Sequence, residues 1–448
     1  MKKEVTQLKY NGSMRVNRIF SFVSGKAMIV LLACFTFGLT GCKKDNTGSG
    51  NGYGTYSQSH GTVIQNGQTF FTSTADLSAV KVTGGTYNLT LSIVSTGGNS
   101  SSVENSSLYG LNAVMLAYGE NEVAVINTED DLISSTGKGA NGIFAYGNAS
   151  INTERDKLTT TGESSNGIMS AGGAIIKVIN DTVTTSGANS SVICGGIITV
   201  LRGAYTSNGA NSPAIYSNGS IRCDTATFTA KGAEALVVEG SNSIELVKCT
   251  VKCTFDKWGS LVFQSTSGNP SVVAGHLTMT GGSFTYTGKK GGMFYNTNST
   301  AYYTLKGVAL SNSCDTLIRC IKGSWGGSSA ANGGNAIFVA DGQTMSGLIH
   351  VDASSKANIS LKNYSAFTGA INNSNTANLV SLTMDYSSNW TLTATSHING
   401  LLSNPMITGS SVKNITGNGF NVFYKSGANP SLGGLTYSLA DGGQLIPE

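Results

Sequence analysis

Three aspartates recur at 25-residue intervals, namely Asp131, Asp156 and Asp181. In a chain that coils once per repeat, this spacing places them on one corner of successive coils, a few ångströms apart. Carboxylates that close repel one another unless they are protonated or bridged by a cation, so Ca²⁺ is one candidate ligand. The alternative is that each aspartate hydrogen-bonds the backbone of its own turn. The second interpretation is favoured, because the column ends after three members.

Aromatic residues form a second group of candidates, because exposed rings stack on the apolar faces of sugars. The candidates for ligand binding lie in the second half of the chain and are Tyr295, Tyr302, Tyr303, Trp325 and Trp390. Trp325 is the best candidate for exposure, since it lies in a Gly/Ser-rich insertion over 324–334. Tyr118 and Tyr146 follow the same turn on neighbouring repeats. Packing in the core is the alternative for all of these rings.

The cysteines offer a disulfide but no zinc site. Cys223 and Cys249 are separated by about one repeat, so adjacent coils could bring them together in an oxidising compartment. The alternative is that both are small buried thiols. No Cys-x-x-Cys pair indicates zinc.

The repeat that would position these side chains is clearest over 138–187. Residues 138–162 and residues 163–187 align with ten identical positions. A period of this length is typical of solenoids, in which each repeat buries its apolar face against its neighbours. From residue 62 onward, short apolar alternations are broken by Gly, Asn, Asp and Ser, which predicts strands joined by turns.

One column can be followed along the chain through glycines that end each repeat. Four residues before each glycine stands an apolar residue, expected to point inward: Ile133, Leu158, Val183, Tyr205, Phe228, Phe255 and Phe284. Strands stack about 4.8 Å apart, so these side chains would form a continuous stack. The last residues, 437–448, are expected to cap the open end.

The period and strand pattern resemble the right-handed parallel β-helix of pectin-lyase-like proteins and bacterial adhesins. The resemblance implies an all-β fold over 62–448, a β-helix of about thirteen coils with roughly 22–31 residues in each coil. It also implies tests for catalysis, since lyases of this fold use an acidic Ca²⁺ cluster with an Arg or Lys base. Hydrolases of this fold carry Asn-Thr-Asp, Asp-Asp, Gly-His-Gly and Arg-Ile-Lys on successive coils. Here the acids of 127–131 form one continuous run, no histidine stands in Gly-His-Gly, and 319–322 (RCIK) is only a loose match. An enzyme is therefore not favoured.

Composition argues against a nucleic-acid partner. Of 28 basic and 24 acidic residues, six and one precede Cys42, which leaves 22 and 23 and a net charge of −1. A basic footprint for nucleic acid is therefore missing from the remainder. Charged residues make up 12% of the chain, against about a quarter in ordinary globular proteins. Low charge suits strands and tight turns.

The N-terminal segment predicts export to the cell envelope. Basic residues precede an apolar run over 27–38, and Met14 is an alternative start to Met1. Residues 39–42 (LTGC) resemble the lipobox of bacterial lipoproteins. The resemblance implies a signal peptide over 1–41, acylation of Cys42, and outer-membrane delivery because Lys43 is not an aspartate. Residues 42–61 are Gly/Ser/Asn-rich, which indicates a flexible tether. A lone Asp45 is a weak form of the acidic signal for surface export in Bacteroides-type bacteria.

We therefore expect a lipid-anchored envelope protein that acts as a surface adhesin-like or glycan-binding module. Its expected partners are the membrane, through the lipid, and glycans or host-cell-surface components. The cell surface is the favoured location, and the periplasmic face is the alternative. The competing functions are a polysaccharide lyase or glycoside hydrolase, and a structural periplasmic-facing lipoprotein. No cofactor is expected, with Ca²⁺ as the only one considered. A site is expected at the aspartate corner or beyond Gly259, where the regular period ends.

Overall fold

The computed structural model describes residues 54–266, 270–326 and 332–448. The predicted signal peptide and Cys42 lie outside the described residues. The described chain forms a right-handed parallel β-solenoid of about 15 turns, so the predicted fold class is confirmed. The expected thirteen coils fall short of this number. One reason is that β1 (Tyr56–Gln58) already pairs with β4 (Val80–Val82), so the first coil includes residues that had been assigned to a tether.

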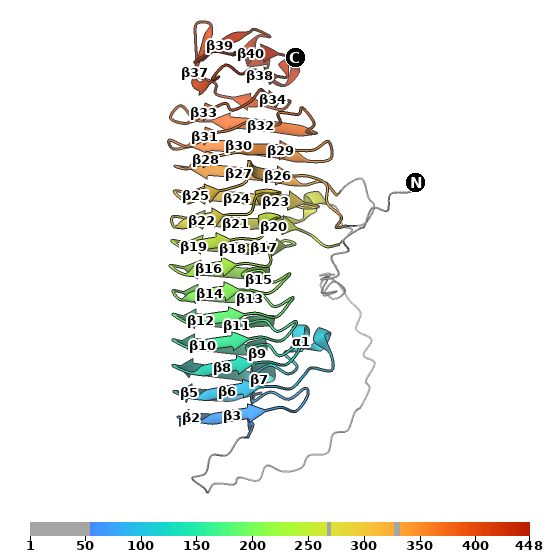
Figure 1. Cartoon of the computed structure of the whole chain (residues 1–448), viewed down its shortest axis with the longest axis vertical. Helices are drawn as coiled ribbons and strands as arrows, with labels where there is room; N and C mark the ends of the chain where they lie inside the picture. Colours follow the sequence, from blue (N-terminus) through green and yellow to red (C-terminus); the bar gives the residue numbers. More distant parts are fainter. Residues whose placement is uncertain (1–53, 267–269, 327–331) are drawn as a thin grey trace, which may run out of the picture.

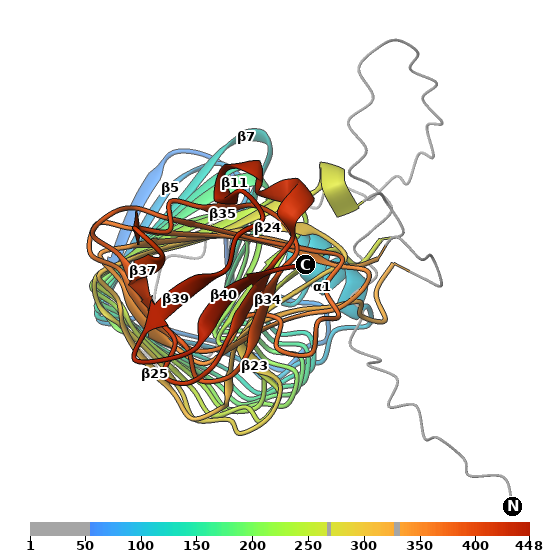
Figure 2. The ribbon, with the colours of Figure 1, turned by 90° about the horizontal axis from the view of Figure 1, so that it is seen from above.

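Three mainly parallel sheets run along the solenoid (Figure 1). Viewed from one end, the coils lie in register around a common interior (Figure 2). The largest sheet has 21 strands and bends within each coil. Besides β1 and β4 it contains β2 (Thr62–Asn66), β5 (Gly85–Thr90), β7 (Met115–Glu129), β9 (Ile143–Glu154), β11 (Ile168–Ile179), β13 (Ile193–Leu201), β15 (Ile215–Asp224), β17 (Leu236–Glu239), β18 (Ser243–Val247), β20 (Trp258–Phe263), β21 (Ala274–Thr280), β23 (Gly292–Thr297), β24 (Thr300–Lys306), β26 (Thr316–Cys320), β27 (Asn335–Asp341), β29 (Leu348–Val351), β30 (Lys356–Lys362), β32 (Leu379–Met384) and β35 (Leu402–Ser403).

The remaining strands form two smaller sheets. The ten-stranded sheet contains β3 (Thr69–Thr72), β6 (Ile93–Thr96), β8 (Leu132–Ser135), β10 (Lys157–Thr160), β12 (Thr182–Thr185), β14 (Ala204–Ser207), β16 (Thr227–Ala230), β19 (Thr250–Cys253), β22 (Ser283–Tyr286) and β25 (Ala309–Asn312). The nine-stranded sheet contains β28 (Thr344–Ser346), β31 (Ala366–Thr368), β33 (Asn389–Thr391), β34 (Ser396–Ile398), β36 (Ile407–Thr408), β37 (Ser411–Thr416), β38 (Val422–Tyr424), β39 (Tyr437–Ala440) and β40 (Gln444–Pro447).

The inward column lies where the period predicted it, with one correction. Ile133, Leu158, Val183, Tyr205 and Phe228 pair in register and are buried. The next member is Val251, whereas the sequence had indicated Phe255. Val251 pairs in turn with Phe284, so the coil between these two is much longer than the one before it. Phe255 therefore takes the position of the turn glycine, and Gly259 belongs to a different column.

Turn glycines are required by close stacking of the coils. A Cβ atom on Gly187 would lie under 3.0 Å from the carbonyl oxygen of Gly162, closer than real Cβ atoms come. Beside it, the Ser190 hydroxyl donates to the same oxygen (3.1 Å). The coils from Gly137 to Gly232 repeat this contact, so side chains larger than hydrogen are excluded from this part of the column.

The two ends of the solenoid differ. At the C-terminal end, β39 and β40 pair antiparallel with each other, which closes the end as the sequence predicted for 437–448. At the N-terminal end, each of β1, β2 and β3 pairs with a single strand among those described. The short helix α1 (Val103–Tyr109) is capped by Ser102 and Gly110 and lies on the outside of the coils. Within the described residues, no helix is both long and apolar enough to cross a membrane.

Candidate functional site

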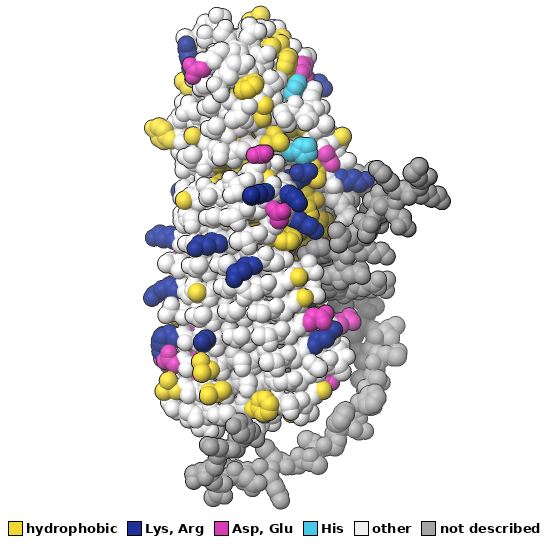
Figure 3. Space-filling view, viewed as in Figure 1, with side chains coloured by type: hydrophobic (Ala, Val, Ile, Leu, Met, Phe, Trp, Pro, Cys, Tyr) yellow, Lys and Arg dark blue, Asp and Glu magenta, His cyan; other side chains and the backbone are white. Residues whose placement is uncertain are grey.

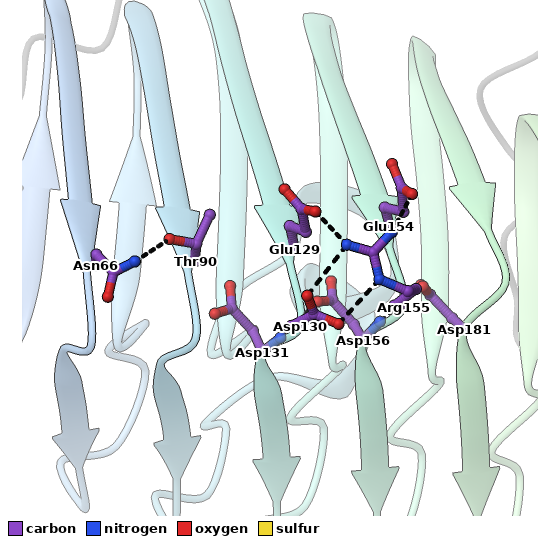
Figure 4. A network of polar contacts seen from close by, with 9 residues as sticks. All are labelled: Asn66, Thr90, Glu129, Asp130, Asp131, Glu154, Arg155, Asp156 and Asp181. Atoms are coloured by element: carbon purple, nitrogen blue, oxygen red, sulfur yellow. Dashed lines mark hydrogen bonds and ion pairs between the residues drawn. The ribbon is translucent and has the colours of Figure 1, made fainter.

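The three aspartates form a buried hydrogen-bonded ladder on one corner. Each carboxylate accepts the backbone N–H of the corner residue in the preceding coil: Asp181 from Asp156 (2.9 Å), Asp156 from Asp131 (2.8 Å), and Asp131 from Ser92 (2.7 Å). The second oxygen of Asp156 accepts the Thr128 hydroxyl, and that of Asp181 accepts Thr153 (2.6 Å). Figure 4 shows the aspartates side by side on adjacent coils.

The ladder is uneven at its N-terminal member. Leu89 stands in register with Thr128, so Asp131 lacks the hydroxyl donor that Thr128 provides to Asp156. The second carboxylate oxygen of Asp131 is buried and has no hydrogen-bond partner among the described residues. An unsatisfied buried oxygen costs free energy, and protonation lowers that cost.

Burial raises the pKa of all three carboxyl groups, because an apolar surrounding disfavours their charged form. The pKa reaches about 7 for Asp131, about 6 for Asp156 and about 7 for Asp181. The donated hydrogen bonds act in the opposite direction but are outweighed by desolvation. Repulsion from Asp156 adds to the pKa shift at Asp131 and at Asp181.

Neutral side chains perform the same task at the same corner farther along. Gln343 accepts the Val308 N–H (2.8 Å), Ser365 accepts that of Gln343 (3.0 Å), and Ser388 accepts that of Ser365 (3.2 Å). The corner therefore needs a hydrogen-bond acceptor and not a charge. Apart from the second oxygen of Asp131, the aspartate oxygens accept from backbone and hydroxyl donors, and no group of three metal-ligating side chains occurs in the described ranges. The own-turn interpretation therefore needs a correction, because each aspartate accepts the backbone N–H of the preceding coil and so joins two adjacent coils.

Outside this corner, an exposed acidic cluster surrounds Arg155. Its guanidinium pairs with Glu129 and Glu154 and with Asp130 (3.0 Å). A shallow groove beside it is lined by Glu129, Glu154 and a ladder of amides in which Asn152 donates to Asn127 and Asn127 to Asn88, both at 2.8 Å. The acids are thus already neutralised in part by a cation from the same chain (Figure 4).

The predicted aromatic residues separate into different environments. Tyr303 and Trp390 are fully buried inside the solenoid, so neither ring can reach a ligand. Tyr303 donates to the Tyr295 carbonyl (3.0 Å), and the Trp390 indole to that of Gly369 (2.9 Å). Tyr302 is exposed and stacks on His276 at 4.8 Å. It belongs to β24, and its strand column is different from that of Tyr295.

Tyr295 and Trp325 do come together, in a cluster that we call the aromatic patch. It lies on the outer face of β15, β17, β20, β23 and β26, and its members are Tyr216, Val237, Trp258, Leu261, Phe263, Tyr295, Ile321 and Trp325. Trp258 stacks on Tyr295 with ring centres 4.4 Å apart, and Trp325 lies 4.9 Å from Phe263. Trp258 and Trp325 are only partly buried, whereas Tyr295 is covered.

Changes in coil length build the aromatic patch. The insertion after β26 carries Trp325 back over the rings, where the Asn332 amide donates to the carbonyls of Gly323 (2.7 Å) and Trp325 (2.9 Å). On the other side Asn298 donates to the Gln264 carbonyl (2.8 Å). Buried amides therefore hold both connections against the outer face.

Charged groups border the aromatic patch. Along one outward column, Tyr295 is followed by Arg319 and then His350 on adjacent coils. Arg319 is half-buried and donates to the Gly291 carbonyl (3.3 Å), and it has no salt bridge in the described part of the chain. Burial, and then the positive charge of Arg319, lower the pKa of His350. Apolar and basic side chains meet on this face (Figure 3).

The cysteines remain separate. All six in the described ranges are free, and Cys223 faces Leu246 of the next coil instead of Cys249. The predicted pairing was wrong because the coil there is shorter than the separation of the two cysteines. Cys249 therefore lies at the corner after β18 and not beside Cys223. Burial raises the pKa of Cys249, which suits an inert buried thiol.

Sequence reasoning missed Trp258, Arg319 and His350 as members of one site. The signal was available in principle, since outward positions alternate with the inward column, but the register around Phe255 was misplaced. Tyr118 and Tyr146 do stack as neighbouring coils predicted, at 4.9 Å.

The fold and its outer-face clusters define the protein as a parallel β-solenoid. No protein-family model, curated protein or solved structure matches the chain.

Proposed function

We propose that this chain is a lipid-anchored envelope protein that binds glycans through the aromatic patch. The single observation behind this proposal is the partly exposed pair Trp258 and Trp325, held over an aromatic floor beside Arg319. Indole rings supply the apolar surface on which sugar rings stack, and their N–H groups supply donors.

The border of the patch favours a ligand that carries an anion. Arg319 has donors left after its bond to Gly291, and a guanidinium binds carboxylate or sulfate in a bidentate manner. Lys322 is exposed beside the patch, and its backbone N–H donates to Asp352 (2.8 Å). A uronic acid or a sulfated sugar therefore fits the chemistry better than a neutral one.

The proposed location follows from the N-terminal sequence. A lipobox that ends at Cys42 resembles that of bacterial lipoproteins, and Lys43 after it favours the outer membrane. A rigid solenoid on such an anchor suits an adhesin-like role at the cell surface. Protease treatment of intact cells tests this location: a chain that stays uncleaved until the outer membrane is opened faces the periplasm, which overturns the adhesin role.

Binding is tested on a glycan array, followed by titration calorimetry of the best acidic oligosaccharide. Trp258→Ala and Trp325→Ala are expected to weaken binding at least tenfold, about 1.4 kcal/mol or more. Tyr302→Ala is the matched control, because this exposed ring lies on another strand column and should bind like the parent. Equal affinity in all three variants, or no binding to any glycan, overturns the proposal.

The same oligosaccharide also tests the enzyme alternative. Incubation with Ca²⁺, followed by ultraviolet detection of unsaturated products, would reveal cleavage by a lyase. The exposed cluster around Arg155 places carboxylates beside an arginine, the groups that lyases of this fold use, so Arg155→Ala would test whether this cluster carries the cleavage. Cleavage would replace simple binding as the function.

A further inference from the structure

The N-terminal end of the solenoid carries an unusual concentration of exposed aliphatic side chains. Ile64 is 77% exposed, Leu91 62%, Ile93 47% and Leu132 50%. Phe71 and Leu77 are also exposed. Ile93 and Leu132 pair in register on adjacent coils, and Leu91 is at the corner that precedes β6. We call these residues of the first coils the end face.

The backbone at Leu91 makes this concentration harder to explain as chance. Leu91 has a φ of 51°, in the left-handed region that favours Gly, Asn and Asp. The corresponding corner residues of later coils are polar: Asp130, Arg155, Asn180 and Arg202. An apolar residue thus occupies a position that is strained for it and exposed to water.

Two outward columns change from apolar to polar with distance from this end. The column of Ile64 continues as Asn88, Asn127 and Asn152, and the column of Ile93 continues as Leu132, Lys157 and Thr182. The same backbone positions accept polar side chains one or two coils away. Apolar residues at the end face are therefore not demanded by the fold.

The part of the end face that lies within residues 54–100 is also nearly free of charge. Residues 54–100 contain one acid and one fixed base, Asp76 and Lys81. The described strands there, β1, β2 and β3, are edge strands. Exposed apolar residues on an uncharged edge normally mark a contact surface.

We propose that the end face docks on the lipid bilayer, which holds the first coils of the solenoid against the membrane. This rests on the lipid anchor of the proposed function, because the occupant is chosen by the chain that joins Cys42 to Gly54. Those twelve residues span at most about 40 Å even when fully extended. The acylated cysteine would hold this end of the stack, and not the C-terminal end, close to the lipid surface. Exposed aliphatic side chains that reach the lipid surface can enter the boundary between headgroups and acyl chains.

Docking leaves the aromatic patch away from the membrane. The patch is formed by coils beyond Leu236, several repeats above the end face (Figures 1 and 3). A solenoid held at its N-terminal coils would keep the patch several coils away from the lipid contact, whereas a solenoid tethered without docking would tumble.

The test separates the end face from the anchor. The mature chain, residues 42–448 with Cys42→Ser, is mixed with phosphatidylcholine vesicles and floated on a density gradient. Neutral lipid is used because Glu120 and Glu122 lie in the neighbouring β7. We expect part of this unacylated chain to float. The triple variant Ile64→Asp, Leu91→Asp, Ile93→Asp should lower the bound fraction at least tenfold.

A matched control uses aliphatic residues exposed in the middle of the stack. Ile175, Ile179 and Ile197 are also exposed, and their replacement by Asp should leave flotation unchanged. Failure of the parent to float, or equal loss in both triple variants, overturns the docking proposal. A concentration-dependent dimer in analytical ultracentrifugation that only the end-face variant dissociates would also overturn it, in favour of a second copy. Mass spectrometry of the native protein tests acylation of Cys42 separately, so an absent lipid refutes the anchor without deciding flotation.

Discussion

The coils from Ile133 to Phe228 and the coils from Leu236 to Val351 share one architecture but differ in the regularity of their length. In the first region, nearly constant coil lengths keep like residues in register. Aspartates and asparagines can therefore hydrogen-bond between adjacent coils, and glycines can stack closely. In the second region the lengths vary, and inserted connections lie on the outer face. Regular coils therefore satisfy most of their own polar groups, and irregular coils bring unlike residues together where a ligand can reach them.

The largest expected effect tests the tight stacking of the regular region. Gly187→Val introduces a Cβ into the Gly162 carbonyl and should destabilise the protein by about 3 kcal/mol. Circular dichroism during thermal unfolding measures the shift. Gly427→Ala is the control, because open space surrounds that glycine. If both variants unfold like the parent, close stacking does not limit the size of these residues.

The aspartate ladder should make stability depend on pH. The folded-state pKa of each aspartate is raised above its unfolded value, so the native state holds more protons between about pH 4 and pH 7. The resulting stabilisation is fully present below pH 4 and is lost as the pH rises through 6 and 7. At pH 8, Asp156→Asn should therefore raise the free energy of unfolding by about 2 to 3 kcal/mol, which appears as a higher unfolding temperature. At low pH the variant should match the parent.

An exposed aspartate gives the comparison for that experiment. Asp315→Asn should leave the pH profile of the parent unchanged. A parent whose unfolding temperature stays constant from pH 4 to pH 8 would contradict the buried-ladder explanation. Asp131→Asn should give a larger gain at pH 8 than Asp156→Asn, because the second oxygen of Asp131 is buried and lacks a partner among the described residues.

A smaller effect is expected at the border of the aromatic patch. Arg319→Ala should weaken an acidic oligosaccharide about tenfold and affect its neutral analogue less, because only the former uses the guanidinium. Arg222→Ala is the matched control, since that arginine pairs with Glu245 on another column. Equal losses for acidic and neutral sugars would remove the preference for anionic ligands while leaving the aromatic stacking intact.

The smallest effect is expected at the exposed cluster of the regular region. Arg155→Ala removes three surface ion pairs that solvent already screens, so the unfolding temperature should fall slightly at low salt. The difference should vanish at high salt, where the remaining carboxylates repel one another less. A large loss that salt does not change would mean that the cluster supports the fold.

Much of the architecture could be predicted because its signal is periodic. The identities between adjacent repeats, and the glycine at each turn, follow from stacking of like coils. The exposure of the candidate aromatic residues was harder to predict, as Tyr302 and Tyr303 show. Adjacent strand residues point to opposite faces, so only one of the two could be exposed. Which one depends on register, and register was lost where the coil length changed at Val251.

The sequence by itself determined the all-β solenoid, the inward apolar stack and the alignment of Asp131, Asp156 and Asp181, because each depends on spacing along the chain. Only the tertiary structure decided that these carboxylates turn inward to backbone donors, and that Trp258, Tyr295 and Trp325 share one surface. The reason is physical: inserted connections fold back over neighbouring coils, and their contacts depend on packing between residues that no fixed period relates.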